Sequence, residues 1–376
     1  QLRPTADTKP IRLASNAGAN ASSSLFVNTT ELQTLEVKEL VVGSYTGKHQ
    51  IDVGDLTAAP GTVITFNVPL TLQAPQAGGH VYLNQKVVGE SIKIYGSGST
   101  TSLNSDLQMA DEVFIDDKIE VGGNRRIDAR TSTPLTPVTD GIRITGAVVG
   151  NADGVADTLS MTAGGYDITF GKTVSLNALT ISNFDDLRFD GDVTIDGGDL
   201  TISADGNDTV RFAGKLTLLN GAKLIVNGLA GGSEMVIFDG GLAVGGTASA
   251  ATSATLTGIS QVVLNSAAGI SGAAGNLAIS GADEVRMTAG SSAAEKTLVQ
   301  VVRGGSSGLG FGLPSYPVKT GLSSPAADSS MSLNAIDLVV DAGGEIRFDR
   351  GLALLSGSTL DINGSAAGCA DRPRTP

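Results

Sequence analysis

Short runs in which apolar and polar residues alternate are the dominant pattern of this chain. Residues 192–203 read DVTIDGGDLTIS and residues 215–228 read KLTLLNGAKLIVNG, and Gly, Asp or Asn separates the runs. A period of two places alternate side chains on opposite faces of a β-strand, and no stretch keeps the helical period over the length of a helix. We therefore predict an all-β fold, with the core-facing positions Val193, Ile195, Leu200, Ile202, Leu216, Leu218, Leu224 and Val226.

The runs recur at nearly regular intervals. FAGKLTLLNGAKLIVNG (212–228) is repeated in altered form as FDRGLALLSGSTLDING (348–364). An apolar-any-apolar phrase also recurs between and before these copies, at 168–170, 187–189, 210–212, 236–238, 262–264 and 285–287. If six coils separate the two copies, one coil has about 22–23 residues, enough for three short strands and three corners. The predicted architecture is a parallel β-helix, or β-solenoid, with three short strands per coil.

Stacking explains why the phrases repeat. A single coil cannot bury its inner face, so like residues pack on like residues in the coils above and below. The inward positions predicted to be equivalent on this basis are Phe189, Phe212, Phe238 and Phe348. Matching positions in the looser and less evenly spaced N-terminal runs are Phe66, Ile94, Phe114, Ile144 and Phe170.

We divide the chain where this pattern changes. Residues 1–30 lack it and are predicted to be an N-terminal extension or irregular segment, whereas residues 31–303 form a β-solenoid with looser N-terminal coils. Residues 304–332 are rich in Gly, Pro and Ser, which predicts a loop excursion before the final coils at 333–365 and a tail at 366–376. Neither end shows an amphipathic helix that would cover a terminal coil. We therefore expect self-association, or contact with neighbouring segments of a longer exoprotein.

Composition narrows the range of partners. Among 376 residues, 38 acidic and 25 basic side chains give a net charge of −13, so we predict no nucleic-acid partner. No run of ~18 apolar residues occurs, so we predict no membrane insertion. The single cysteine, Cys369, cannot form a disulfide within the chain. Aromatic residues make up only 4% of the sequence, so we expect few platforms on which sugars could stack.

Sequence motifs of common enzymes are missing. No P-loop, dinucleotide-binding, zinc-protease, paired-cysteine or serine-hydrolase motif occurs in its required context. The two histidines, His49 and His80, have no neighbouring Cys or His and no obvious serine partner. We interpret them as surface or turn residues rather than as a base or metal ligand. A Ser-His-Asp arrangement assembled from distant coils stays open at this stage.

Acidic residues are the remaining candidates for catalysis, because β-helix enzymes that act on polysaccharides align carboxylates on one face. One cluster consists of Asp111, Glu112, Asp116, Asp117 and Glu120, followed by Arg125 and Arg126. A second cluster consists of Asp185, Asp186, Asp190, Asp192, Asp196 and Asp199. The simpler interpretation is that these Asp residues end strands and accept hydrogen bonds from backbone amides at corners. We favour it, and we predict no enzymatic activity and no cofactor.

One segment resembles a calcium-binding repeat. SADGNDTVR (203–211) is similar to a single degenerate copy of the Gly-Gly-x-Gly-x-Asp-x-apolar-x repeat of secreted toxins of the RTX type. Ser203 and Ala204 replace the first two glycines, and no tandem copy faces this one. The residues that would bind calcium are Asp205, Asn207 and Asp208. A turn without metal is the alternative interpretation.

The phrases LTISNFDDLRFDGDVTI, GDLTISADG and GKLTLLNGAKLIVNG resemble the β-solenoid coils of bacterial secreted exoproteins, the filamentous-haemagglutinin-like and autotransporter-passenger-like adhesins. The resemblance covers residues ~60–365 and implies a non-enzymatic, structural or adhesive rod that is extracellular or displayed on a bacterial cell surface, with a host or matrix surface as partner. The first residue is Gln1, so we expect a processed product or a fragment. The alternative function is a polysaccharide-active β-helix enzyme, a glycosidase or lyase, that uses one of the acidic clusters.

Overall fold

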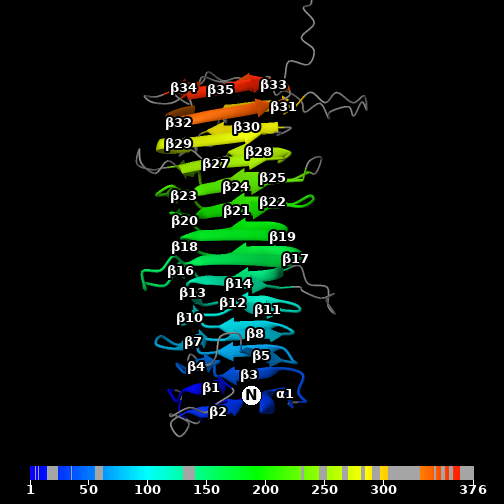
Figure 1. Ribbon diagram of the computed structural model, residues 1–376, viewed down its shortest axis with the longest axis vertical. Coiled ribbons are helices and arrows are strands. Elements are labelled where there is room, and N and C mark those ends of the chain that lie inside the picture. The colour runs from blue at the N-terminus through cyan, green and yellow to red at the C-terminus, as the bar shows by residue number, and fades with distance from the viewer. Residues whose placement is uncertain are drawn as a thin grey trace, which may run out of the picture.

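The computed structural model forms an elongated stack of β-strands that lie across its long axis (Figure 1). It describes residues 1–264 except 5, 7, 15–23, 35, 56–61, 130–139, 230–232 and 245–251. Beyond residue 264 it describes the backbone of the strands between residues 270 and 364. Within the described residues, no helix is both long enough and apolar enough to cross a membrane.

Three strands make one coil, and equivalent strands of successive coils pair side by side, so the stack has three faces. Face A contains β3 (Leu40–Gly43), β6 (Leu70–Gln73), β9 (Ile92–Tyr95), β12 (Val113–Ile115), β15 (Asp140–Ile144), the second halves of β17 (Thr158–Phe170) and β19 (Ala178–Phe189), β22 (Thr209–Phe212), β25 (Met235–Phe238), β28 (Gln261–Leu264) and β30 (Glu284–Ala289). Face B contains β2 (Leu25–Asn28), β1 (Ile11–Ala14), β4 (Gln50–Val53), β7 (His80–Leu83), β10 (Thr100–Leu103), β13 (Lys118–Val121), β16 (Val148–Gly150), β18 (Val174–Leu176), β20 (Val193–Asp196), β23 (Leu216–Leu219), β26 (Leu242–Val244) and the start of β29 (Ile270–Ser280). Face C contains β5 (Val63–Phe66), β8 (Lys86–Gly89), β11 (Leu107–Met109), β14 (Asn124–Asp128), the first halves of β17 and β19, β21 (Asp199–Ser203), β24 (Lys223–Asn227), β27 (Thr252–Thr257), the rest of β29, β32 (Met331–Ala342) and β35 (Thr359–Gly364). The predicted parallel β-helix with three strands per coil is confirmed.

Coil length varies along the stack. On face A, Leu40 pairs with Leu70 of the next coil, whereas Ile168 pairs with Leu187, so the first of these coils is more than half as long again as the second. Ten successive pairings lead from Leu40 to Val285, and the mean coil is slightly longer than the repeat of the sequence predicts. The excess arises because loops at the corners lengthen some coils without breaking the strand pairing.

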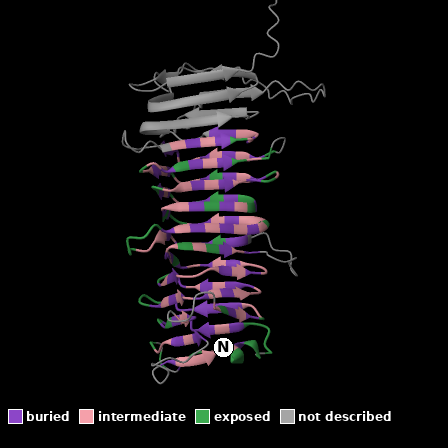
Figure 2. Ribbon diagram, viewed as in Figure 1, coloured by how far each residue is buried: buried purple, intermediate pink, exposed green. Residues whose placement is uncertain are grey.

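Buried residues alternate with less buried ones along the described strands (Figure 2), and the buried hydrophobic side chains form one core cluster. All eight core positions predicted from the alternation, Val193 to Val226, are fully buried. Phe189, Phe212 and Phe238 occupy equivalent inward positions on face A, as predicted, and Phe170 extends the row. Neighbouring rings stack nearly parallel, with centroids 4.8–5.1 Å apart and interplanar angles of 3–5°. The side chain of Phe348 lies outside the described residues.

The prediction for the N-terminal runs is only partly right. Ile94, Ile144 and Phe170 share the inward row of face A, but Phe66 belongs to face C. Phe114 points outward from face A, because it lies between the two inward residues of β12. The spacing of the repeated sequence phrases predicts neither the face of Phe66 nor the orientation of Phe114. A shift of one residue moves a strand's side chains to the opposite face of the sheet.

Some strands, β17 and β19 among them, continue through a corner without interruption. Strands β17 and β19, of 13 and 12 residues, each bend from face C to face A. Gly164 and Gly165 have φ of 61° and 80° at the bend of β17, and Asn183 has φ of 53° at the bend of β19. Gly and Asn tolerate this left-handed conformation better than other residues do, so the sequence allows a corner without a loop.

The described residues up to Thr34 close the N-terminal end of the stack. Beneath face B, β2 pairs with β1, and beneath face A, Leu2 forms a parallel bridge with Val42. Beneath face C, helix α1 (Thr29–Gln33) packs on β5 and buries Leu32, and Asn28 caps the helix in a capping box with Glu31. Residues 1–30, expected to form an irregular extension, thus contribute strands to the ladder. The expectation that neither end carries a helix is wrong at this end.

The pairing changes in the last described coils. Strand β31 (Thr297–Arg303) pairs antiparallel with both β30 and β33 (Gly344–Phe348). Strand β34 (Leu352–Leu354) pairs in parallel with β32, as does β35, so parts of the predicted final coils at 333–365 return to the regular order. Residues 304–330 of the predicted excursion and the tail at 366–376, with Cys369, lie outside the described residues.

Candidate functional site

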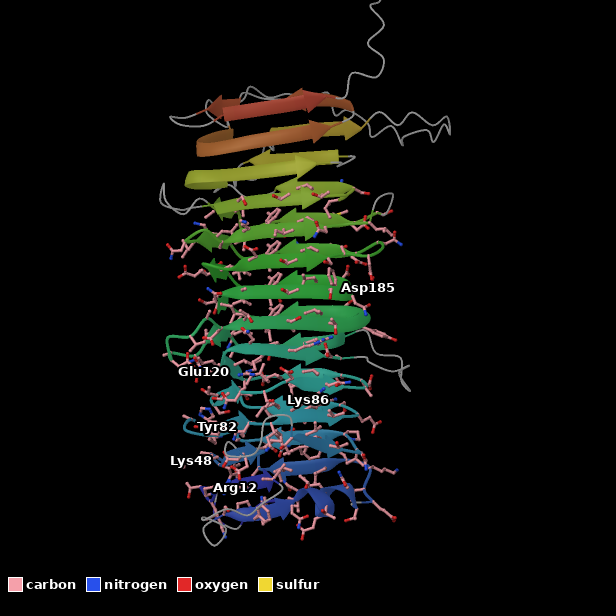
Figure 3. The ribbon with its side chains drawn as sticks, viewed as in Figure 1. Arg12, Lys48, Tyr82, Lys86, Glu120 and Asp185 are labelled. Carbon is pink, nitrogen blue, oxygen red and sulfur yellow. The ribbon has the colours of Figure 1, made fainter. Side chains whose placement is uncertain are left out.

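A row of chemically varied side chains runs along the outside of face B on the N-terminal coils. The strand register aligns Arg12 with Asp52, Asp52 with Tyr82, Tyr82 with Ser102, and Ser102 with Glu120. Beside this row, the register aligns His80 with Thr100 on the next strand. Figure 3 shows Arg12, Tyr82 and Glu120 one above another on the same side of the stack. We call Arg12, Asp52, His80, Tyr82, Ser102 and Glu120 the face-B cluster.

His80 is the centre of this cluster. Its Nε2 lies 2.8 Å from Oγ of Ser102, and its ring stacks on Tyr82 with centroids 3.9 Å apart and an interplanar angle of 7°. His80 begins β7, so its ring is on the surface of the sheet, as the sequence interpretation expected. The serine partner comes from the next coil, which no local motif reveals.

Carboxylates flank His80 on both sides. Asp52 accepts hydrogen bonds from Nε2 of Gln50 at 3.0 and 3.1 Å and lies 3.9 Å from Nε of Arg12, and Glu120 pairs with Lys118 at 2.7 Å. Burial raises the pKa of Asp52, an effect that Gln50 and Arg12 oppose. Burial lowers the pKa of His80, although Glu120 and Asp52 act in the opposite direction. A lowered pKa favours the neutral imidazole, which can accept a hydrogen bond from the hydroxyl of Ser102.

The Ser102–His80 contact lacks one component of an acyl-transfer site. Ser102 lies in the interior of β10, which pairs in parallel with β7 on one side and with β13 on the other. The backbone N–H groups of such a strand are used in the ladder, so they are not free to stabilise an oxyanion. The cluster is better suited to binding a polar ligand than to cleaving one.

A second group, of outward-facing aromatic residues, lies at the corner between faces A and B. The ring centroids of Tyr45 and Tyr95 are 5.7 Å apart, those of Tyr95 and Phe114 are 5.4 Å apart, and 61% of Tyr45 is exposed. Nζ of Lys93 lies 3.2 Å from a carboxylate oxygen of Glu112 on the same face. The low aromatic content predicted few stacking platforms, but the fold gathers several of the aromatic residues on the outside of the N-terminal coils.

His49, predicted to be a surface or turn residue, lies in the connection between β3 and β4 but is shielded from solvent. It is fully buried, and its Nδ1 lies 3.1 Å from the carbonyl oxygen of Lys9. Its Nε2 has no hydrogen-bond partner. His49 is thus fully buried and His80 is half-buried, and only His80 contributes to the outward-facing cluster on face B.

The first acidic cluster is spread around one coil rather than assembled. Glu112 pairs with Lys93 on face A, and Glu120 pairs with Lys118 on face B. Asp116 accepts a hydrogen bond from Oγ1 of Thr145, and Asp117 is buried at a corner. Arg126 pairs with Asp128 at 2.7 Å, and Nε of Arg125 donates to the carbonyl oxygen of Gly122 at 2.5 Å. These contacts match the structural interpretation better than the catalytic one.

The second acidic cluster follows the same pattern. Asp186 and Asp192 accept hydrogen bonds from the backbone N–H groups of Thr209 and Lys215 in the next coil, at 3.2 and 2.8 Å. Asp190 pairs with Arg188, and Asp196 accepts from Nδ2 of Asn220. Asp185 and Asp199 lie at the two ends of face C, at a bend and at the start of β21. Asp190 thus pairs within its own coil, whereas Asp186, Asp192 and Asp196 accept hydrogen bonds from the next coil.

The three residues predicted to bind calcium lie in different environments. Asp205 and Asn207 are exposed, whereas Asp208 is buried and accepts a hydrogen bond from the backbone N–H of Asp205 at 2.7 Å. Among the residues that the structure describes, no group of three or more His, Cys, Asp or Glu side chains is arranged to hold a metal ion. Asp208 therefore accepts a hydrogen bond that closes its own turn.

Neither a family model, nor a curated protein, nor a solved structure matches this chain. The class of protein is thus defined by the fold alone, a three-faced parallel β-solenoid with a partly buried, outward-facing polar and aromatic cluster on its N-terminal coils.

Proposed function

We propose that this protein is a non-enzymatic structural and adhesive β-solenoid, secreted or displayed on a bacterial cell surface, as part of a larger exoprotein or of a self-associating fibre. The observation that carries the proposal is the unequal distribution of charged and aromatic side chains among the outward positions of face B. The N-terminal coils present the face-B cluster, whereas the central coils present Ser175, Thr194 and Thr217 at equivalent outward positions.

This distribution fits a rod with one adhesive region. Tyr and Arg are the residues that most often anchor protein interfaces, because they combine a large contact area with directed hydrogen bonds. The face-B cluster and the corner of Tyr45 place such residues on a surface of parallel strands that the core holds rigidly. Adhesion needs an exposed and rigid surface, and a host or matrix surface is the partner that we propose.

Binding to immobilised matrix proteins and polysaccharides tests the adhesive function. We expect the combined variant Tyr45→Ala, Tyr82→Ala to lose at least about tenfold in affinity for the probe that the wild-type protein binds, or ~1.4 kcal/mol. The matched control is Ser175→Ala, Thr217→Ala, on the bland part of face B, which should bind normally. The proposal is wrong if the wild-type protein binds none of these surfaces, or if both pairs weaken binding equally.

Self-association has its own test. Size-exclusion chromatography with light scattering, followed by electron microscopy, should show oligomers or fibres that grow with protein concentration. A stable monomer at every concentration would contradict the fibre and leave the adhesive rod as the remaining form of the proposal.

A second candidate function, a polysaccharide-active enzyme, is favoured by one observation, the 2.8 Å contact between His80 and Ser102. Incubation with a panel of acidic and neutral polysaccharides distinguishes the two functions. We expect no product release from the wild-type protein. Turnover that Ser102→Ala, Asp116→Asn or Asp186→Asn abolishes would overturn the non-enzymatic proposal.

A further inference from the structure

Two carboxylates come together at the corner where face C turns into face A. The register pairs Thr209 of β22 with Met235 of β25, so the residues before them, Asp208 and Glu234, occupy equivalent positions in successive coils. The backbone confirms the match, because the N–H of Met235 donates to the carbonyl oxygen of Asp208 at 2.9 Å. Adjacent strands lie about 4.8 Å apart, so the two side chains start at that separation.

Both side chains are turned into the corner. Only 4% of Asp208 and 1% of Glu234 is exposed to solvent. Asp208 accepts one hydrogen bond, from the N–H of Asp205, and Glu234 accepts one, from the N–H of Leu229 at 2.8 Å. Oε2 of Glu234 is buried and has no hydrogen-bond partner. Within the described part of the chain, no Lys, Arg or His forms an ion pair with either carboxylate.

This arrangement is costly for two ionised groups. A buried charge requires an opposite charge or several hydrogen-bond donors, and like charges on neighbouring strands repel each other. Asp185, one coil earlier at the equivalent position, and the exposed Asp205 add further negative charge (Figure 3 labels Asp185).

Other buried corner carboxylates are provided with donors and stand singly. Asp117 accepts hydrogen bonds from Oγ of Ser99 at 3.0 Å and from Oγ1 of Thr101 at 2.9 Å. Asp157 accepts from the N–H of Gly123 at 2.7 Å. The pair of Asp208 and Glu234 differs because two carboxylates occupy equivalent positions of successive coils. Oδ1 of Asp117 is also buried without a hydrogen-bond partner, but the equivalent residue of the preceding coil is Ser99.

We propose that Asp208 and Glu234 form a binding site for a calcium ion that links two successive coils of the solenoid. Calcium accepts oxygen ligands in flexible geometry, including carboxylates, backbone carbonyls and water, so two carboxylates from adjacent strands are a suitable start. Magnesium requires near-ideal octahedral geometry, which a strand-bound pair supplies less readily. The site keeps Asp208 from the sequence hypothesis but replaces the exposed Asp205 and Asn207 with Glu234.

Titration of the EDTA-treated protein with CaCl2 tests the site. We expect a dissociation constant of about 10⁻⁴–10⁻³ M by calorimetry, the range of extracellular calcium modules, and a Tm that rises with calcium. Glu234→Gln should lose the calorimetric signal and the rise in Tm. In EDTA its Tm should equal or exceed that of the wild-type protein, because the variant removes one of two repelling charges.

Controls keep the outcome decisive. Asp157→Asn, a change at a different buried corner carboxylate, should retain the calcium response, and Asp208→Asn replaces Glu234→Gln if the latter does not fold by circular dichroism. Absence of binding by the wild-type protein up to millimolar calcium would overturn the proposal. So would an unchanged response in Glu234→Gln, and an equal response to MgCl2 would overturn the assignment to calcium.

Discussion

The coils built from residues 40–128 and those built from residues 158–238 share one architecture but differ in what fills it. In the first region, the inward row of face A is aliphatic, with Leu72, Ile94 and Ile115. In the second region, four stacked Phe rings fill the same row. Among the described residues, the first region also buries many polar side chains, namely Ser44, His49, Thr71, Gln73, Gln85, Ser91, Ser99, Thr101, Ser102 and Asp117, whereas the second buries only Asp208 and Glu234.

The comparison shows that closely superposed coils and more variable coils occupy different parts of the same repeat fold. Stacked rings require successive coils to superpose closely, and strands β17 and β19, which carry Phe170 and Phe189, turn a corner without a loop. The N-terminal coils have looped corners, whose backbone groups need partners, and buried polar side chains supply them. Ser99, for example, donates to the carbonyl oxygen of Gly96 within one corner. The outward-facing aromatic group of Tyr45, Tyr95 and Phe114 lies on these more variable coils.

Removal of a stacked ring should have the largest effect. We expect Phe212→Ala to destabilise the protein by about 3–5 kcal/mol, because the ring is fully buried between Phe189 and Phe238 and leaves a cavity. The converse change, Ile94→Phe, adds a ring to the aliphatic part of the same row and should cost about 1–3 kcal/mol by overpacking. Urea denaturation measures both. A cost below about 1 kcal/mol for Phe212→Ala would show that the two regions do not differ in packing.

The cap of the N-terminal coils should contribute less. Asn28→Ala removes the acceptor for the N–H of Glu31 at the start of α1, and we expect a loss of about 1 kcal/mol. Thr30→Ala, an exposed position in the same helix, is the matched control and should change stability by less than about 0.5 kcal/mol. Equal effects of the two changes in thermal unfolding would mean that α1 does not close this end.

The buried carboxylate of the N-terminal coils should make stability depend on pH. Burial raises the pKa of Asp117 to about 6, above its value of about 3.9 in an unfolded chain. A raised folded-state pKa stabilises the protein below the unfolded value, and this stabilisation is lost as the pH rises through about 6. Asp117→Asn cannot ionise, so its Tm relative to the wild-type protein should rise between pH 4 and pH 7. A constant difference in Tm between the two proteins across this range would contradict the prediction. Asp208 is present in both proteins, so it does not affect this difference.

The smallest effect is expected at the surface of the central coils. Arg188 pairs with Asp190 two residues later, and 56% of the Arg188 side chain is exposed. Exposed ion pairs contribute little because water and salt screen them, so Arg188→Ala should cost no more than about 0.5 kcal/mol. Lys93→Ala, at the outward position of face A in the N-terminal coils, is expected to behave similarly. A larger loss for Lys93→Ala in the same urea experiment would indicate that the surface, and not only the core, differs in energy between the regions.

Much of the fold follows from local patterns. The alternation in residues 192–203 and 215–228 identifies the buried positions, because the period of two does not depend on neighbouring coils. The repeated phrases around Phe189, Phe212 and Phe238 identify equivalent positions because like residues must stack. Residues 11–14 and 25–28 carry too short a pattern to define strands, and their pairing with one another and with β4 shows that they are strands.

The sequence by itself determined the class of fold, the inward residues of the central coils and the preference of acidic residues for corners. It did not determine which outward side chains meet, because that depends on the register between coils, and the length of a coil differs from one part of the stack to another. The contact of His80 with Ser102 and the alignment of Asp208 with Glu234 each join residues of successive coils. Only the tertiary structure determines these contacts. Each loop changes the sequence separation between coils, while the hydrogen-bonded ladder holds the strands in register.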